Sequence, residues 1–139
     1  MTTLLREMRQ RLGPDKLIIV DGFVDLISEE GWKYANYAVS QAYGATSATR
    51  LKQRFDWIKE YIGPERYIVT ENFESWAATG GVTFRDPERG EMPSLLGMAY
   101  WNPVEGRKGG LGTFHMEYEF SNNYKYLRQA IQIMNPAKK

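Results

Sequence analysis

Two stretches of this chain, LGPDKLIIVDGF (12–23) and IGPERYIVTENF (62–73), match in residue type at almost every position. Each runs from an apolar residue through Gly-Pro, an acid and a base into four mostly apolar residues, and then to an acid followed two positions later by Phe. Gly suits the residue after a helix and Pro cannot continue one. A short apolar run bounded by turn residues is typical of a strand buried on both faces of a parallel sheet. Each stretch therefore predicts a junction from a helix to a strand.

Apolar residues at helical spacing precede both junctions and follow the last strand. The three predicted helices carry Leu5, Met8 and Leu12; Leu51, Phe55, Ile58 and Ile62; and Tyr124, Leu127, Ile131 and Met134. Ser121 and Asn122 are candidate N-caps for the last helix. Strands are expected at 17–20, 36–43, 67–70 and 95–101.

This alternation predicts an α/β fold with a parallel sheet and right-handed crossovers. Four strands in roughly 100 residues match half of a (β/α)8 barrel. A small doubly wound sheet is the alternative, but no glycine-rich phosphate loop follows its first strand. We expect a single partial domain over 1–139. Polar and apolar residues alternate from Thr113 to Phe120, which predicts a strand or hairpin arm, and we expect residues 106–120 to form a hairpin or loop insertion before the last helix.

The composition excludes several classes of function. The chain has 18 basic and 17 acidic residues and a formal net charge of +1, so no net field favours nucleic acid. Without cysteine there are no disulfides or thiolate metal sites, and one histidine makes a His-rich site implausible. No apolar run approaches the length of a membrane span. We expect no metal and no cofactor.

Candidate site residues follow from the rule that function collects at the carboxyl ends of parallel strands. They are Asp21, Gln41, Tyr43, Glu71, Asn72, Trp101 and Asn102. Gln41 and Tyr43 share one face of their strand, and Trp101 lies above the small residues Gly97 and Ala99 as a flat floor. An aromatic floor surrounded by amide, phenol and carboxylate groups suits a sugar. Any one of these residues taken alone is more often structural than a ligand contact. A catalytic pair of Asp21 and Glu71 would need carboxylates about 5 to 9 Å apart.

The chain resembles the C-terminal half of a glycoside hydrolase family 18 domain, of the endo-β-N-acetylglucosaminidase-like branch common in Bacteroidetes. The matching segments are LLREMRQRLGPDKLIIVDG (4–22), SQAYG (40–44), YIVTENFE (67–74), LLGMAYWNP (95–103), GRKGGLGTFHMEYEF (106–120) and YKYLRQAIQIMNP (124–136).

The resemblance implies strands five to eight of a TIM barrel that hydrolyses N-glycans next to N-acetylglucosamine. In this family the acetamido oxygen of the substrate attacks the anomeric carbon, and a Glu closing a D-x-x-D-x-D-x-E motif on the fourth strand is the general acid. By resemblance, Tyr43 orients the acetamide with Gln41 beside it, and Trp101 lies under the −1 sugar. Asp21, Glu71 and Asn72 are expected to contact sugar hydroxyls, and Asn102 is a further substrate-binding candidate. A secreted, periplasmic or cell-surface location is also implied.

One departure from the family pattern decides what the chain is expected to do alone. No D-x-x-D-x-D-x-E motif occurs in these 139 residues. We therefore expect a truncated domain that is inactive alone, since proton transfer by a general acid contributes roughly 10² to 10⁴ in rate.

A half barrel would also leave two sheet edges unpaired, which predicts association with the missing N-terminal half or with a second copy. The alternative is a non-catalytic glycan-binding or assembly module. A third candidate is a small hydrolase that uses Asp21 and Glu71.

Overall fold

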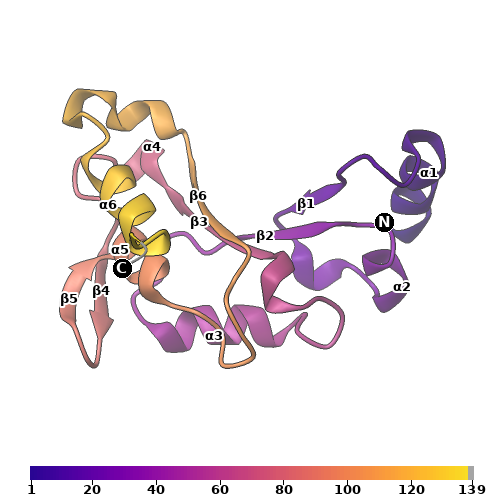
Figure 1. The fold of residues 1–139 in the computed structure, drawn as a ribbon, viewed down its shortest axis with the longest axis horizontal. Helices are drawn as coiled ribbons and strands as arrows, with labels where there is room; N and C mark the ends of the chain where they lie inside the picture. The colour runs from indigo at the N-terminus through magenta and orange to yellow at the C-terminus, as the bar shows by residue number, and fades with distance from the viewer. Residues whose placement is uncertain (138–139) are drawn as a thin grey trace.

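The structure is a computed structural model, and it describes residues 1–137. Its centre is a four-stranded sheet in the order β1-β2-β3-β6, with all three neighbouring pairs parallel. The strands are β1 (Ile19–Asp21), β2 (Tyr37–Gln41), β3 (Tyr67–Asn72) and β6 (Gly110–Phe114). A two-stranded antiparallel hairpin, β4 (Thr83–Asp86) with β5 (Gly90–Pro93), lies outside this sheet. The described residues form an open sheet and no closed barrel, as Figure 1 shows.

The first helix precedes the first strand, the last helix follows the last strand, and the other helices lie between strands along the chain. They are α1 (Thr2–Leu12), α2 (Glu29–Trp32), α3 (Ala48–Asp56), α4 (Phe73–Trp76), α5 (Ser94–Tyr100) and α6 (Lys125–Met134), with 3₁₀ turns η1 (Val24–Leu26), η2 (Pro64–Arg66) and η3 (Met116–Asn122). In Figure 1, α1 and α2 gather near β1, whereas α5, α6 and the β4–β5 hairpin gather at the other end of the molecule. None of the helices in residues 1–137 is long and apolar enough to cross a membrane.

The two faces of the sheet differ in what covers them. On one face, alternate residues such as Ala38, Tyr67 and Val69 are fully buried. They pack against Leu51 and Phe55 of α3, and Ile58 and Ile62 just after α3 are also buried in this core. The predicted helix over 51–62 is confirmed only as far as Asp56, and residues 57–62 form turns that still bury Ile58 and Ile62.

The other face of the sheet is open. The register pairs Ile19 with Tyr37 and Val39 with Ile68, so these four side chains share this face. Ile19 is 51% exposed, although its residue type and strand position are typical of a core. The prediction that the first strand is buried on both faces is therefore wrong for this structure.

The two repeated stretches do form helix-to-strand junctions, and they do so in different ways. Gly13 follows α1 with φ of 77°, and its N–H donates to the carbonyl of Arg9, which ends the helix. Gly63 instead has an extended backbone, and Pro64 begins the 3₁₀ turn that leads into β3. Gly13 thus ends α1. Helix α3 already ends at Asp56, so the prediction that Gly63 and Pro64 end the second helix is wrong.

The predicted strand over 95–101 is wrong, because residues 94–100 form helix α5. Leu95, Met98 and Ala99 are buried in this helix. A short buried helix and a buried strand both appear in the sequence as a short apolar run. The fourth strand is β6, which pairs with β3 from Gly110 to Phe114. The predicted hairpin or insertion over 106–120 is also wrong: the segment supplies this sheet strand and then the turn η3.

Helix α6 is confirmed, but its predicted caps are not its caps. The carboxylate of Glu119, which is fully buried, accepts hydrogen bonds from the backbone N–H groups of Tyr126 and Leu127. A carboxylate at this position satisfies free N–H groups of the first helical turn. Ser121 and Asn122 lie within η3, before the helix begins.

Candidate functional site

Polar side chains gather where three parallel strands end on the open face. Asp21 ends β1, Gln41 ends β2, and Asn72 ends β3. Gln41 Nε2 donates a hydrogen bond of 3.4 Å to Asp21 Oδ1, so the first two side chains touch. Asn72 Oδ1 accepts from the backbone N–H of Ser75 at 3.4 Å and caps α4, which fixes its position. Asp21 and Gln41 are exposed and Asn72 is half-buried, so a ligand can reach all three.

Tyr43 joins this group from the loop after β2. Its ring lies 6.2 Å from that of Phe114, centroid to centroid, with an interplanar angle of 34°. Phe114 ends β6 and pairs in register with Asn72, so the aromatic pair borders the polar group. Partial burial raises the pKa of the Tyr43 phenol, and the negative charges of Asp21 and Glu71 act in the same direction. The phenol therefore stays protonated at neutral pH and can donate a hydrogen bond.

Glu71 lies at the same end of β3 but points to the opposite face. It is fully buried. Its Oε1 accepts hydrogen bonds from the backbone N–H groups of Gly44 (2.9 Å) and Asn72 (2.8 Å). Its Oε2 accepts one from Ser94 Oγ. Burial raises the pKa of this carboxyl, against the lowering effect of its three hydrogen bonds. Glu71 is thus part of the frame behind the open face.

The proposed catalytic pair of Asp21 and Glu71 is therefore wrong. Asp21 shares the open face with Val39 and Ile68, whereas Glu71, three residues beyond Ile68, faces the helices. The sheet itself separates the two carboxylates, so they cannot act on one substrate bond.

Trp101 and Asn102 do not lie at a carboxyl end, which corrects their predicted positions. Trp101 follows α5, and its ring packs edge-on against that of Tyr67, the first residue of β3, with centroids 6.5 Å apart. Asn102 Oδ1 accepts from the backbone N–H of Lys108, just before β6 begins. Both residues lie at the amino ends of the strands, because the segment expected to be a strand is a helix.

A buried lysine completes this amino-end cluster. Lys108 is 3% exposed, and its Nζ donates to the carbonyls of Ala99 (3.0 Å) and Trp101 (2.6 Å). Burial lowers its pKa to about 8, and the nearby charge of Arg107 adds to this effect. Lys108 thus satisfies carbonyls at the end of α5, which is a structural role.

Phe114 and His115, at the end of β6, lie beside the carboxyl-end group and were not among the predicted site residues. His115 has a left-handed backbone with φ of 58°, and its ring lies 4.0 Å from that of Phe114. Its Nδ1 is 2.9 Å from Glu117 Oε1. The alternation from Thr113 to Phe120 predicted a strand or hairpin arm outside the series of parallel strands, so the rule on carboxyl ends did not extend to it. Recognising GLGTF as a strand would have placed Phe114 and His115 at the site.

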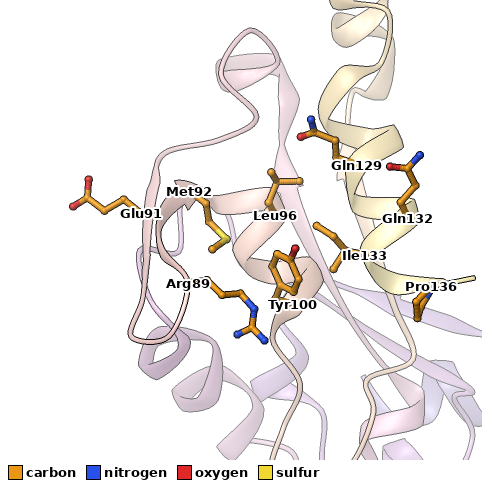
Figure 2. A pocket seen from close by; sticks show the side chains of 9 residues that line it. All are labelled: Arg89, Glu91, Met92, Leu96, Tyr100, Gln129, Gln132, Ile133 and Pro136. Carbon is orange, nitrogen blue, oxygen red and sulfur yellow. The ribbon is translucent and has the colours of Figure 1, made fainter.

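A separate groove lies away from this site. Its volume is about 680 Å³. Figure 2 shows Tyr100 and Leu96 of α5 facing Ile133 of α6, with Arg89 beside the Tyr100 ring. None of the carboxyl-end residues lines this groove. Within residues 1–137, no three His, Asp or Glu side chains are placed to hold a metal ion.

The carboxyl-end group offers hydrogen-bond donors and acceptors beside two aromatic rings, on an apolar sheet face. The donors are the Gln41 amide and the Tyr43 phenol, and the acceptors include the Asp21 carboxylate. This arrangement can bind a ligand with hydroxyl or amide groups and an apolar ring face. A family model described as "Glycoside hydrolase family 18, BT1044-like" matches residues 1–133.

The chain belongs to glycoside hydrolase family 18. Its predicted resemblance to this family is confirmed. A search of curated protein sequences finds no significant match to this chain.

Solved structures agree with the family assignment. The family 18 chain is 31% identical to BT1044, solved as a selenomethionine Glu-to-Gln variant, with a TM-score of 0.78; the match covers 96% of this chain and 43% of that one. It is 24% identical, with a TM-score of 0.73, to a double variant of endo-β-N-acetylglucosaminidase from Cordyceps militaris in complex with fucosyl-N-acetylglucosamine-Asn. The apo form of that enzyme gives 23% identity and a TM-score of 0.72.

Both Cordyceps matches cover 97% of this chain and 50% of the other. These similarities show the fold. The family 18 chain therefore spans about half or less of the length of these structures.

Proposed function

We propose that this chain supplies strands five to eight of a family 18 barrel and that its carboxyl-end cluster contacts a glycan containing N-acetylglucosamine. The observation that carries the proposal is the open face of the sheet: an apolar surface that ends in Asp21, Gln41, Tyr43 and Asn72. In a closed barrel this face is the packed interior, and the carboxyl ends form the active site. The exposed Ile19 and Phe114 are then covered by the other strands.

Each member of the cluster has a role in this proposal. The protonated phenol of Tyr43 donates to the acetamide of the sugar, and Gln41 is held beside it by Asp21. Asp21 and the free amide nitrogen of Asn72 contact hydroxyl groups. The hydrolysis is substrate-assisted and takes place next to N-acetylglucosamine, once strands that carry the acidic motif complete the barrel. The 139-residue chain alone is inactive, because its sequence contains no D-x-x-D-x-D-x-E motif.

The absence of that motif from these residues also favours a second function, a non-catalytic module that binds glycans through the same cluster. The two functions share the sugar contacts and differ in turnover. Assembly through the open face fits both, because β1 and β6 each have an unpaired edge in the four-stranded sheet.

Calorimetric titration with chitobiose tests the sugar contacts. We expect heat of binding from the 139-residue chain, and an affinity roughly three- to tenfold weaker for Tyr43→Phe, which removes one hydrogen bond. Trp101→Phe is the matched control. It keeps an aromatic ring against Tyr67 at the other end of the strands, so it should leave the affinity unchanged. Weakened binding in Trp101→Phe, with normal binding in Tyr43→Phe, would contradict the assigned site.

A further inference from the structure

We infer that Glu71 is the positioning residue of this site: its buried carboxylate holds the backbone that presents Tyr43 and Asn72, and it does not touch the ligand. The inference rests on the proposed sugar site. Glu71 Oε1 accepts from two N–H groups, that of Gly44 at 2.9 Å and that of Asn72 at 2.8 Å. Gly44 directly follows Tyr43, so a single oxygen atom joins the backbones of the two ligand-facing residues.

The loop that carries Tyr43 has little freedom apart from this bond. Gly44 has φ of 64°, a conformation that residues with a side chain rarely adopt, and a Cβ atom there would lie 3.2 Å from the ring of Trp76. The chain thus reverses sharply next to Tyr43 and turns its N–H inward to Glu71. Removing the acceptor would leave a half-buried N–H group without a partner, which favours a different loop conformation.

The second carboxylate oxygen anchors Glu71 to the rest of the fold. Oε2 accepts from Ser94 Oγ at the start of α5, and Ser94 Oγ accepts from the backbone N–H of Val82 at 3.0 Å. The backbone packs closely here: a Cβ on Gly81 would lie 1.9 Å from Ser94 Oγ and 3.0 Å from Glu71 Oε2. Glu71 and Ser94 are both fully buried. The carboxylate is therefore held in one place and can fix the position of what it binds.

The chemistry of the three partners accounts for an acid at this position. All three donate a hydrogen to Glu71, and a carboxylate is the side-chain group that only accepts, through two oxygens. Glutamine would place an N–H₂ group against one of these donors. Burying a carboxylate has a cost in folding free energy, and the three hydrogen bonds offset it.

The chain offers a matched control in Glu119. It is also fully buried, and it also accepts two backbone N–H groups, those of Tyr126 and Leu127. Both of these belong to α6, and neither is a residue of the sugar cluster. Substituting either acid should lower stability. Only substitution of Glu71 should change the site.

The test combines chitobiose binding with NMR of the 139-residue chain, at a temperature where every variant is folded. Glu71→Gln should weaken chitobiose binding roughly tenfold to a hundredfold, and Glu119→Gln should change it less than about twofold. In the wild-type chain the amide proton shifts of Gly44 and Asn72 should titrate together as Glu71 ionises. In Glu71→Gln both titrations should vanish. If Glu71→Gln does not fold, Ser94→Ala, which removes one anchor, should weaken binding in the same direction.

Three results would overturn the inference. The first is unchanged affinity in Glu71→Gln, or in Ser94→Ala, alongside weakened affinity in Tyr43→Phe; the sugar site would then stand without this positioning role. The second is lost affinity with unchanged Gly44 and Asn72 amide shifts, which would make Glu71 a direct ligand contact. The third is the absence of a common Gly44 and Asn72 titration. If the wild-type chain itself fails to bind chitobiose, the proposed function is what fails, and the titration still decides whether Glu71 holds the two amides.

Discussion

At the scale of the residue, burial changed the interpretation of the charged side chains most. Asp21, Glu71 and Lys108 all have ionisable side chains, but only Asp21 is exposed to a ligand. Glu71 and Lys108 are buried and satisfy backbone groups. Position at the end of a strand predicted Asp21, Gln41 and Asn72 because it fixes the height along the sheet. The same rule also selected Glu71 as a ligand contact, although its side chain lies on the opposite face, because the face that a side chain takes depends on the register of the whole strand.

Lys108 makes the stability of the chain depend on pH in a defined direction. Its pKa is lowered from 10.5 to about 8 in the folded chain, chiefly by burial. Below about pH 8 the lysine is protonated in both states, and the cost of burying its charge is fully present. Between about pH 8 and 10.5 the folded chain loses the proton before the unfolded chain does, so the free energy of unfolding should rise with pH.

Urea unfolding of the wild-type chain and of Lys108→Met at several pH values checks this effect. The difference in unfolding free energy between the two should change by a measurable amount between pH 7 and pH 10, in favour of the wild type as pH rises. Parallel curves over that range would show that the ammonium group is not destabilised by the fold.

At the scale of the element, three of four predicted strands are confirmed and one is a helix. The strands β1, β2 and β3 carry β-branched and aromatic residues bounded by turn residues, which is a strong signal. The segment 95–101 is equally apolar, and a short buried helix cannot be distinguished from a strand by periodicity alone. Strand β6 was hidden because Gly110 and Gly112 resemble a loop; a Cβ on Gly112 would lie 3.2 Å from Thr70 Cγ2 of the neighbouring strand.

Substitution of Gly97 tests how α5 packs against the β4–β5 hairpin. Alanine normally favours a helix over glycine by roughly 1 kcal/mol. A Cβ at this position, however, would lie 2.3 Å from the ring of Phe84, which is fully buried in β4. We therefore expect Gly97→Ala to lower the free energy of unfolding by about 1–3 kcal/mol, through overpacking.

Chemical denaturation measures this change, and the double variant Gly97→Ala with Phe84→Leu should recover part of the loss, because the two sites are in contact. A Gly97→Ala chain more stable than wild type would show that helix propensity dominates and that the packing described for α5 is wrong.

At the scale of the whole molecule, the sequence predicted a partial family 18 barrel from its alternating elements and its matching segments. The family is now shown over residues 1–133. The structure adds the property that the pattern did not reveal: one sheet face is covered by helices and the other is open, with Ile19 and Phe114 exposed. Apolar runs such as LIIV predict a strand that is buried on both faces. The open face would be buried only if further strands closed the sheet.

We propose that this open face is the inside of a family 18 active site that other strands complete. The most direct measurement mixes the 139-residue chain with a polypeptide that carries the first four strands of a BT1044-like family 18 domain, including its acidic motif. Complex formation is followed by light scattering, and hydrolysis by release of a chromophore from an aryl chitobioside. We predict a one-to-one complex that turns over the substrate, no turnover by either half alone, and reduced turnover with Tyr43→Phe. Turnover by the 139-residue chain alone, the absence of a complex, or a complex without turnover would contradict the account.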